Sequence, residues 1–290
     1  MMSWFLLAFA SAVFSAAASI TEKKALFGMR AVDFSIVISL SNAALALPLF
    51  LLADYSSVTT DALLLLAGKN LLGALAFLCV MTAIRNLELS RALPLMVLTP
   101  GVVAIAAFLF LGETITPLEI AGIVLLMVGT YVLEMQAGDA IAPFRAFFAS
   151  RTHLPIIAAL LLFTATSVLD RLLLVDIRLQ PLPMMAFQQS FYAGWFLLFA
   201  LAVRRTPRAL ATATRGSWHW IAIVALLTFV YRFAQIEATA LAPVALVLAV
   251  KRLSVFIGAM AGGTLFAERH LVRKAVAIVI LLVGAGLVVG

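Results

Sequence analysis

Cysteine and charged residues are scarce in this sequence. Its 1 cysteine, Cys79, excludes a disulfide within the chain. Only 11% of the residues are charged, whereas 65% are hydrophobic. A soluble domain carries about 25% charged residues, and so apolar a surface would associate in water. The composition therefore excludes an ordinary soluble protein and predicts that most of the surface faces lipid.

The sequence also lacks the motifs of common enzyme classes. It has no His-Glu-x-x-His zinc motif, no Gly-x-Ser-x-Gly nucleophile motif and no Walker sequence for nucleotide phosphates. These absences predict that the chain is not an enzyme and has no catalytic residues, metal site or cofactor. They also disfavour ATP-driven pumping by this chain alone. A membrane-embedded enzyme remains the least favoured alternative.

The basic excess, a net charge of +7, lies between apolar stretches and does not form one face. Lys and Arg beside membrane-spanning helices are an ordinary orientation signal, so no nucleic-acid partner is predicted. Most of these residues follow odd-numbered apolar stretches, which by the positive-inside rule places both termini outside the cell. The expected partners are a small-molecule substrate and membrane lipid, with a monomer or a homodimer left open.

Apolar stretches alternate with charged or Pro/Gly-rich breaks along the whole chain. A helix needs about 20 apolar residues to cross a bilayer. The predicted stretches are 4–21, 32–53, 62–84, 91–111, 116–134, 154–175, 183–203, 218–236, 241–266 and 271–289. This pattern predicts an all-α integral membrane protein with ten transmembrane helices, multi-pass in the inner (plasma) membrane.

The two halves of the sequence resemble each other. The longest polar stretch separates a first five-helix repeat, 1–137, from a second, 153–290, with a loop at 138–152. Glu113 and Glu268 close equivalent stretches, and Gly129 and Gly284 follow each of them sixteen residues later. Because five is odd, the second repeat enters the membrane from the opposite side, which is the inverted-repeat plan of many secondary transporters. Both glutamates are interpreted as carboxylates that favour the N-terminus of the following helix.

The same segments carry a family resemblance. The first copy is Thr99-Pro100-Gly101 followed by Phe110-Leu111-Gly112-Glu113; the second is Gly262-Gly263-Thr264-Leu265-Phe266-Ala267-Glu268. The second copy departs by carrying Ala267 for the last glycine and Val255 for Pro100. Over essentially the whole chain, the pattern resembles the EamA-type permeases of the drug/metabolite transporter superfamily. The resemblance implies a transporter with both termini in the cytoplasm, contrary to the charge count, and does not identify a substrate.

Lys251 and Arg252 are the most informative charged residues. They lie about ten residues into the ninth stretch, or about 15 Å along a helix, near the bilayer midplane. A charge there costs at least about 2.5–3.5 kcal/mol, so it requires a reason. One interpretation is a cationic clamp for an anionic substrate group, and the pair resembles the Lys-Arg of organophosphate translocators. The alternative is a structural pairing with Glu237 or Asp170.

Other polar residues within the apolar stretches extend the predicted substrate-binding set. They are Ser39, Asn42, Lys69, Gln188, Gln189, Tyr192, Trp195, Tyr231 and Arg232. Gln188, Tyr192 and Trp195 share one helix face, which favours a cavity. Lys69 is interpreted equally as a cavity residue or as a lysine that extends to the interface. Ser11, Ser15 and Ser19 also share a face, and helix–helix contact is favoured there.

These observations predict a secondary transporter that moves a small metabolite across the inner membrane by alternating access. The neutral polar and aromatic residues favour an amino-acid-like solute, whereas Lys251 and Arg252 favour an anionic one. Exchange of an organophosphate or a related metabolite is the alternative. The sequence leaves open the substrate, the coupling ion, the direction of transport and the oligomeric state.

Overall fold

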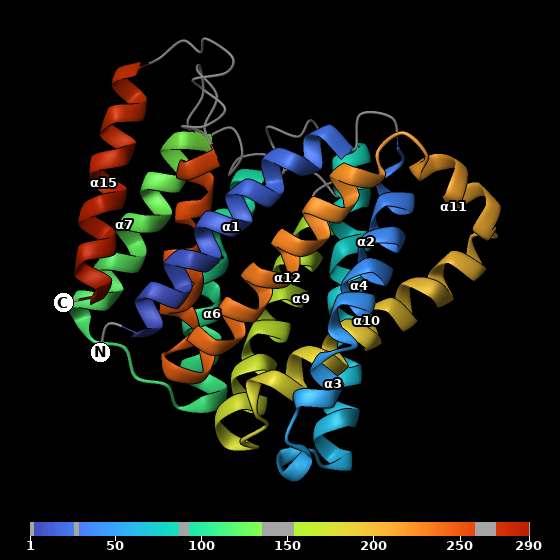
Figure 1. Ribbon diagram of the computed structural model, residues 1–290. Coiled ribbons are helices and arrows are strands. Elements are labelled where there is room, and N and C mark those ends of the chain that lie inside the picture. Colours follow the sequence, from blue (N-terminus) through green and yellow to red (C-terminus); the bar gives the residue numbers. More distant parts are fainter. Residues whose placement is uncertain (1–2, 26–28, 87–92, 135–153, 259–270, 290) are drawn as a thin grey trace.

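The computed structural model describes the chain except for residues 1–2, 26–28, 87–92, 135–153, 259–270 and 290. The described residues form helices and turns, with no strand among them (Figure 1). The first half contains α1 (Ser3–Ala25), α2 (Ala31–Ala46), α3 (Leu49–Leu52), η2 (Tyr55–Ser57), α4 (Thr60–Asn86), η3 (Leu93–Leu98), α6 (Thr99–Leu111) and α7 (Pro117–Glu134). The second contains α9 (Leu154–Arg171), the π-helix η5 (Leu172–Asp176), α10 (Pro181–Ala202), α11 (Pro207–Thr214), α12 (Trp218–Leu241), α13 (Val244–Lys251) and α15 (Leu271–Val289). The predicted loop at 138–152 and Glu268 lie outside the described residues.

Several helices are long and apolar enough to cross a membrane. Among the described residues there are five, Ser3–Glu22, Val32–Leu52, Thr60–Val80, Leu154–Asp176 and Trp218–Leu241. The pair α10 and α11, bent by 109°, raises the number to six. Shorter apolar helices, Met96–Leu111, Pro117–Leu133 and Val276–Val289, occupy the places of the fourth, fifth and tenth predicted stretches. The chain is therefore a multi-pass membrane protein.

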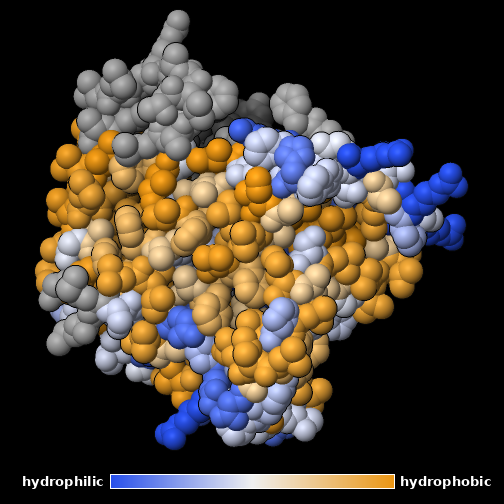
Figure 2. Space-filling model, viewed as in Figure 1, coloured by the Kyte–Doolittle hydropathy of each residue, from blue (hydrophilic) through white to orange (hydrophobic). Residues whose placement is uncertain are grey.

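On the face shown in Figure 2 the surface is mostly apolar, as lipid contact requires. Leu6, Phe110 and Leu226 are 57%, 78% and 55% exposed. The interior includes many small residues, such as Ala8 and Ala12 of α1, which are fully buried. Small side chains let helix backbones approach closely where no hydrophobic effect drives them together.

Local signals set the ends of the helices. Thr116 and Glu119 form a capping box at the start of α7: Thr116 N–H donates to Glu119 Oε2 (2.7 Å), and Glu119 N–H donates to Thr116 Oγ1 (3.3 Å). At the end of α6, Gly112 takes a left-handed conformation with φ 64°, which favours glycine. The helix-terminal role predicted for Glu113 is therefore filled by Glu119, and Glu113 bonds elsewhere.

The most extensive helix contacts join one helix of each half. The largest are α1 with α12, α7 with α15, α4 with α9 and α2 with α10, and α6 with α13 is a smaller contact of the same kind. In Figure 1, α1 lies along α12 and α15 lies along α7, and both chain termini lie at one end of the molecule. The core therefore lies between the halves and not within each of them.

Glycines set the contact between α7 and α15. A Cβ at Gly284 would lie 2.9 Å from Leu125 Cβ and 3.0 Å from Gly122 O, and one at Gly122 would lie 2.8 Å from Gly284 O. No side chain fits there. Gly286, two residues further along α15, has no neighbouring atom within 4 Å of such a Cβ.

A polar connection outside the apolar helices joins the start of α10 to the segment before α4. The Asp54 carboxylate accepts hydrogen bonds from Ser56 N–H (2.9 Å), Ser56 Oγ (2.7 Å) and Gln180 Nε2 (3.2 Å). The hydrogen bond from Ser56 N–H, followed by those from the two side chains, lowers the pKa of Asp54. Its contribution to stability is present above the ordinary carboxyl pKa and is lost as the pH falls through the lowered one.

Candidate functional site

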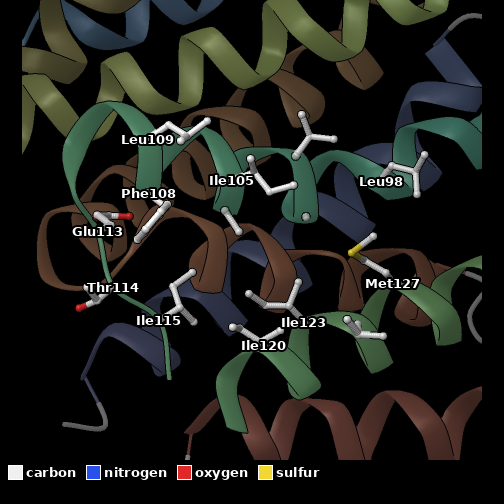
Figure 3. Close-up of a pocket in the computed structure, with 14 residues that line it drawn as sticks. Leu98, Ile105, Phe108, Leu109, Glu113, Thr114, Ile115, Ile120, Ile123 and Met127 are labelled. Carbon is white, nitrogen blue, oxygen red and sulfur yellow. The ribbon is translucent and has the colours of Figure 1, made fainter. Parts of the chain in front are cut away.

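One hollow on the described surface is an apolar groove between α6 and α7 (Figure 3). It measures about 840 Å³, and Leu98 and Met127 lie at one end, with Glu113 and Thr114 at the other. Its walls belong to the outer surface, since Ile105 and Phe108 are 63% and 60% exposed. Such a wall suits lipid acyl chains and offers little that could distinguish a polar solute, so the groove is not the candidate site.

The second hollow is polar and lies where helices of both halves converge. It measures about 270 Å³. Its lining comprises Ser15, Lys69, Met96, Thr99, Phe163, Thr166, Ser167, Asp170, Tyr192, Arg232, Gln235, Leu248, Lys251, Arg252 and Ser254. The volume is below the roughly 300–1,000 Å³ of pockets for drug-sized ligands. We therefore regard this polar cavity as the candidate site for a small metabolite.

Lys251 and Arg252 lie at the end of α13, on the cavity wall. Lys251 Nζ donates to Gln235 Oε1 (2.5 Å) and lies 4.6 Å from the centre of the Tyr231 ring. Arg252 Nη2 donates to Met96 O (2.5 Å) and Thr99 Oγ1 (3.1 Å). Within the described part of the chain, no carboxylate lies within 4.0 Å of Lys251 Nζ. The neutral Gln235 oxygen and the Tyr231 ring thus hold the Lys251 side chain in place, and neither supplies a negative charge.

Asp170 is instead paired with Lys69. The Lys69 ammonium lies 2.5 Å from Asp170 Oδ1 and also donates to Gln188 Oε1. Asn70 Nδ2 donates to Gln188 O (3.4 Å), so consecutive residues of α4 hold α10. Lys69 is 2% exposed, which excludes the lysine extended to the interface and places its charge inside the protein.

Tyrosines stand beside the cations. Tyr231 lies against both Lys251 and Arg232, whose guanidinium carbon is 5.8 Å from the ring centre. A cation over an aromatic face is stabilised by the ring quadrupole. Tyr192 packs its hydroxyl against Gly73 of α4, where a Cβ would collide with it. Glycine at position 73 is therefore what brings the Tyr192 hydroxyl to the backbone of α4.

The structure places the predicted site residues in three groups. Those that line the polar cavity are Lys69, Tyr192, Arg232, Lys251 and Arg252. Those that contact a cavity lysine are Gln188 and Tyr231. Those placed outside are Gln189, Trp195, Ser39 and Asn42: Gln189 faces Met185 Sδ, Trp195 Nε1 donates to Ala67 O (3.1 Å), Ser39 donates to Ile36 O (2.8 Å), and Asn42 is buried.

Asp170, Gln235, Thr99 and Ser15 belong to the cavity, although the sequence did not single them out as binding residues. Asp170 carried a signal, since a carboxylate deep in an apolar stretch is a functional candidate by default. Ser15 shares a helix face with Ser11, which donates to Tyr231 O (2.9 Å) across the α1–α12 contact. Spacing alone could not separate the serine that joins helices from the one that lines the cavity.

The charges of the lining residues define what the cavity can hold. Four basic side chains, Lys69, Arg232, Lys251 and Arg252, line the cavity together with a single acidic one, Asp170. Nearby like charges in a medium of low dielectric repel strongly, so an anion that enters relieves their repulsion. Among the described residues, no group of three His, Cys, Asp or Glu side chains could hold a metal ion. The cavity is suited to an anionic solute held by ammonium and guanidinium groups.

Comparisons with known proteins agree with the sequence resemblance. The model of the EamA-like transporter family matches residues 2–135. No curated protein matches the chain in sequence. A crystal structure of a protein with 15% identity superposes with a TM-score of 0.74, covering 99% of this chain and 96% of that one. At so low an identity the superposition shows a shared fold alone, and it extends that fold to both halves.

Proposed function

We propose that this chain is a secondary transporter that carries a small anionic metabolite across the inner membrane. The match of residues 2–135 to the model of the EamA-like transporter family supports the transporter class. Alternating access is the proposed mechanism: the polar cavity opens to each side of the bilayer in turn. An organic phosphate or a carboxylate is the proposed class of substrate.

The observation that carries the proposal is the charge of the polar cavity. Its carboxylate, Asp170, already has a partner in Lys69. Lys251 and Arg252 present a point charge and a planar fork side by side, which suits a phosphate or carboxylate. Burial of so many cations in a membrane is costly, and a bound anion offsets that cost.

The helix contacts support two inverted repeats of five spans, 1–137 and 153–290. In chain order, α1, α2, α4, α6 and α7 of the first half correspond to α9, α10, α12, α13 and α15 of the second. When each helix is exchanged for its counterpart, the contact of α1 with α12 becomes the contact of α9 with α4. The contacts α2–α10, α6–α13 and α7–α15 are each returned unchanged. A set of contacts that survives this exchange is expected of a pseudo-two-fold axis through the cavity.

Counterflow in proteoliposomes tests the proposed function. The purified protein is loaded with candidate solutes from three classes, organic phosphates, carboxylates and amino acids, and uptake of the labelled solute is measured. We expect uptake of an anion, and a loss of about 100-fold or more in Lys251→Ala and in Arg252→Ala, since each removes a charged contact in a site of low dielectric. Arg208→Ala is the control, because Arg208 is exposed on α11.

One observation favours a second candidate, a zwitterionic solute such as an amino acid. Asp170 lies in the same cavity as Lys251 and Arg252, so it could receive an ammonium group while they hold a carboxylate. This arrangement requires Asp170 to leave Lys69. Robust transport of a zwitterion that is lost in Asp170→Asn as well as in Lys251→Ala and Arg252→Ala would overturn the anionic assignment in favour of this candidate.

A further inference from the structure

Two consecutive residues at the end of α9 bind the first half of the chain on two sides. Asp170 pairs with Lys69 of α4 at 2.5 Å, and Arg171 Nε lies 2.5 Å from Oε1 of Glu113, which follows α6. Neighbouring residues on a helix point about 100° apart. The dipeptide therefore reaches two separate elements of the first half at one level of the bundle.

These ion pairs lie at one end of the polar cavity. Asp170 lines the cavity, whereas Arg171 does not. Arg171 Nη1 also donates to Thr239 O (2.6 Å) and Ala240 O (3.2 Å), about one helical turn beyond the cavity residue Gln235 on α12. The ends of α6, α9 and α12 lie toward the same end of the molecule as the two termini (Figure 1). The ion pairs thus stand between the cavity and that end.

The ion pair of Arg171 with Glu113 is largely shielded from solvent, but one of its carboxylate oxygens lacks a hydrogen bond from the part of the chain that the structure describes. The side chains of Arg171 and Glu113 are 14% and 10% exposed, and Glu113 Oε2 is buried with no hydrogen-bond partner among the described residues. A buried carboxylate oxygen without a partner raises the free energy of the closed arrangement. Directly after Arg171, the chain continues as a π-helix over Leu172–Asp176, a local feature often found at functional sites.

We propose that Asp170 and Arg171 form a latch, consisting of the pairs Asp170–Lys69 and Arg171–Glu113, that closes the cavity toward the end that bears the termini. Both pairs separate when the cavity opens on that side. The latch rests on the proposed transport function, because only a carrier with two access states requires a closure that breaks and reforms.

Cysteine accessibility tests the latch without a substrate. Cys79→Ser removes the native thiol, and Ser167→Cys places a reporter on the cavity wall, one turn before the latch. A membrane-impermeant, anionic methanethiosulfonate is applied to proteoliposomes, and the labelling rate is measured. Protease cleavage of a C-terminal tag identifies the molecules whose termini face the reagent.

We expect Glu113→Gln and Arg171→Gln each to raise the labelling rate from the terminal side roughly tenfold, as loss of a buried ion pair shifts the closed state toward opening. Because the two residues act as one pair, the double variant is expected to label no faster than either single variant. Arg205→Gln is the matched control. It removes a comparable ion pair, Arg205–Asp33 at 2.9 Å, away from the cavity lining, and the rate is expected to stay unchanged.

Unchanged rates in both single variants, or effects that multiply in the double variant, overturn the latch. Size-exclusion chromatography in detergent first establishes that each variant is folded. If Arg171→Gln fails this check, Glu113→Gln decides alone, since it preserves the size of the side chain and removes only its charge. The labelling result stands even if no anion is transported, so failure of the latch and failure of the proposed function are separate outcomes.

Discussion

Two contacts between the halves of the chain are built from opposite kinds of residue. Where α4 meets α9 and α10, the buried Lys69 ammonium bonds to both Asp170 and Gln188. Where α7 meets α15, Gly122 and Gly284 bring the two backbones together. Charged groups in the membrane interior are costly and close apolar packing is not. Under the proposed function, the first contact belongs to the transport site, whereas the second holds the backbones of the bundle together.

The largest effect is expected from Lys69→Met, which breaks the polar contact. It leaves the Asp170 carboxylate without its partner, and removal of one member of a buried ion pair costs about 3–5 kcal/mol. The free energy of unfolding in mixed micelles measures the loss. Adding Asp170→Asn removes the uncompensated charge and is expected to restore part of the stability. A double variant no more stable than Lys69→Met would show that the pair is not what holds this contact.

A smaller effect is expected from Gly284→Ala in the apolar contact. The added methyl meets Leu125 and the backbone of Gly122, which cannot move aside, and overpacking costs about 1–3 kcal/mol. Gly286→Ala is the matched control on the same helix, since nothing lies within 4 Å of its added Cβ. Thermal unfolding of both variants provides the measurement. Equal midpoints would mean that this glycine contact does not contribute to stability.

The smallest effect on stability is expected from Gly73→Ala, which places a methyl group where α4 meets the polar cavity. The nearest atom is the hydroxyl of Tyr192, the far end of a side chain that can rotate away. We expect the free energy of unfolding to fall by less than about 1 kcal/mol. The substrate concentration needed for half-saturation is expected to rise, because Tyr192 leaves its place on the cavity wall. In a Tyr192→Phe background, the added methyl is expected to have less effect on both quantities. An unchanged half-saturation constant would remove Tyr192 from the binding site.

Much of the fold was predictable because it depends on local features of the sequence. Every predicted apolar stretch contains a helix, and Pro117, Pro181 and Pro207 each begin one. The EamA resemblance is confirmed over residues 2–135. The division into ten spans and two inverted repeats stays a prediction, because several helices, such as α13, are short in the described part of the chain.

The candidate site was predictable only in part. Charged residues within apolar stretches, such as Lys251 and Lys69, could be identified from the sequence. The free-energy cost of placing a charge in the membrane marks them whatever their partners are. Tyr192 and Trp195 both contact α4, as a shared face predicts, yet only Tyr192 lines the cavity. Helical spacing identifies the shared face but not which of its side chains reaches the cavity.

The sequence by itself determined that this chain is a multi-pass helical membrane protein with buried charge, since hydrophobicity, helix ends and the cost of a charge in lipid are properties of single segments. Tertiary structure alone decided the partners: Asp170 pairs with Lys69, Lys251 donates to Gln235, and Glu113 pairs with Arg171. The two ion pairs join residues 58 or more positions apart. Their geometry depends on how whole helices pack, and no local pattern records it.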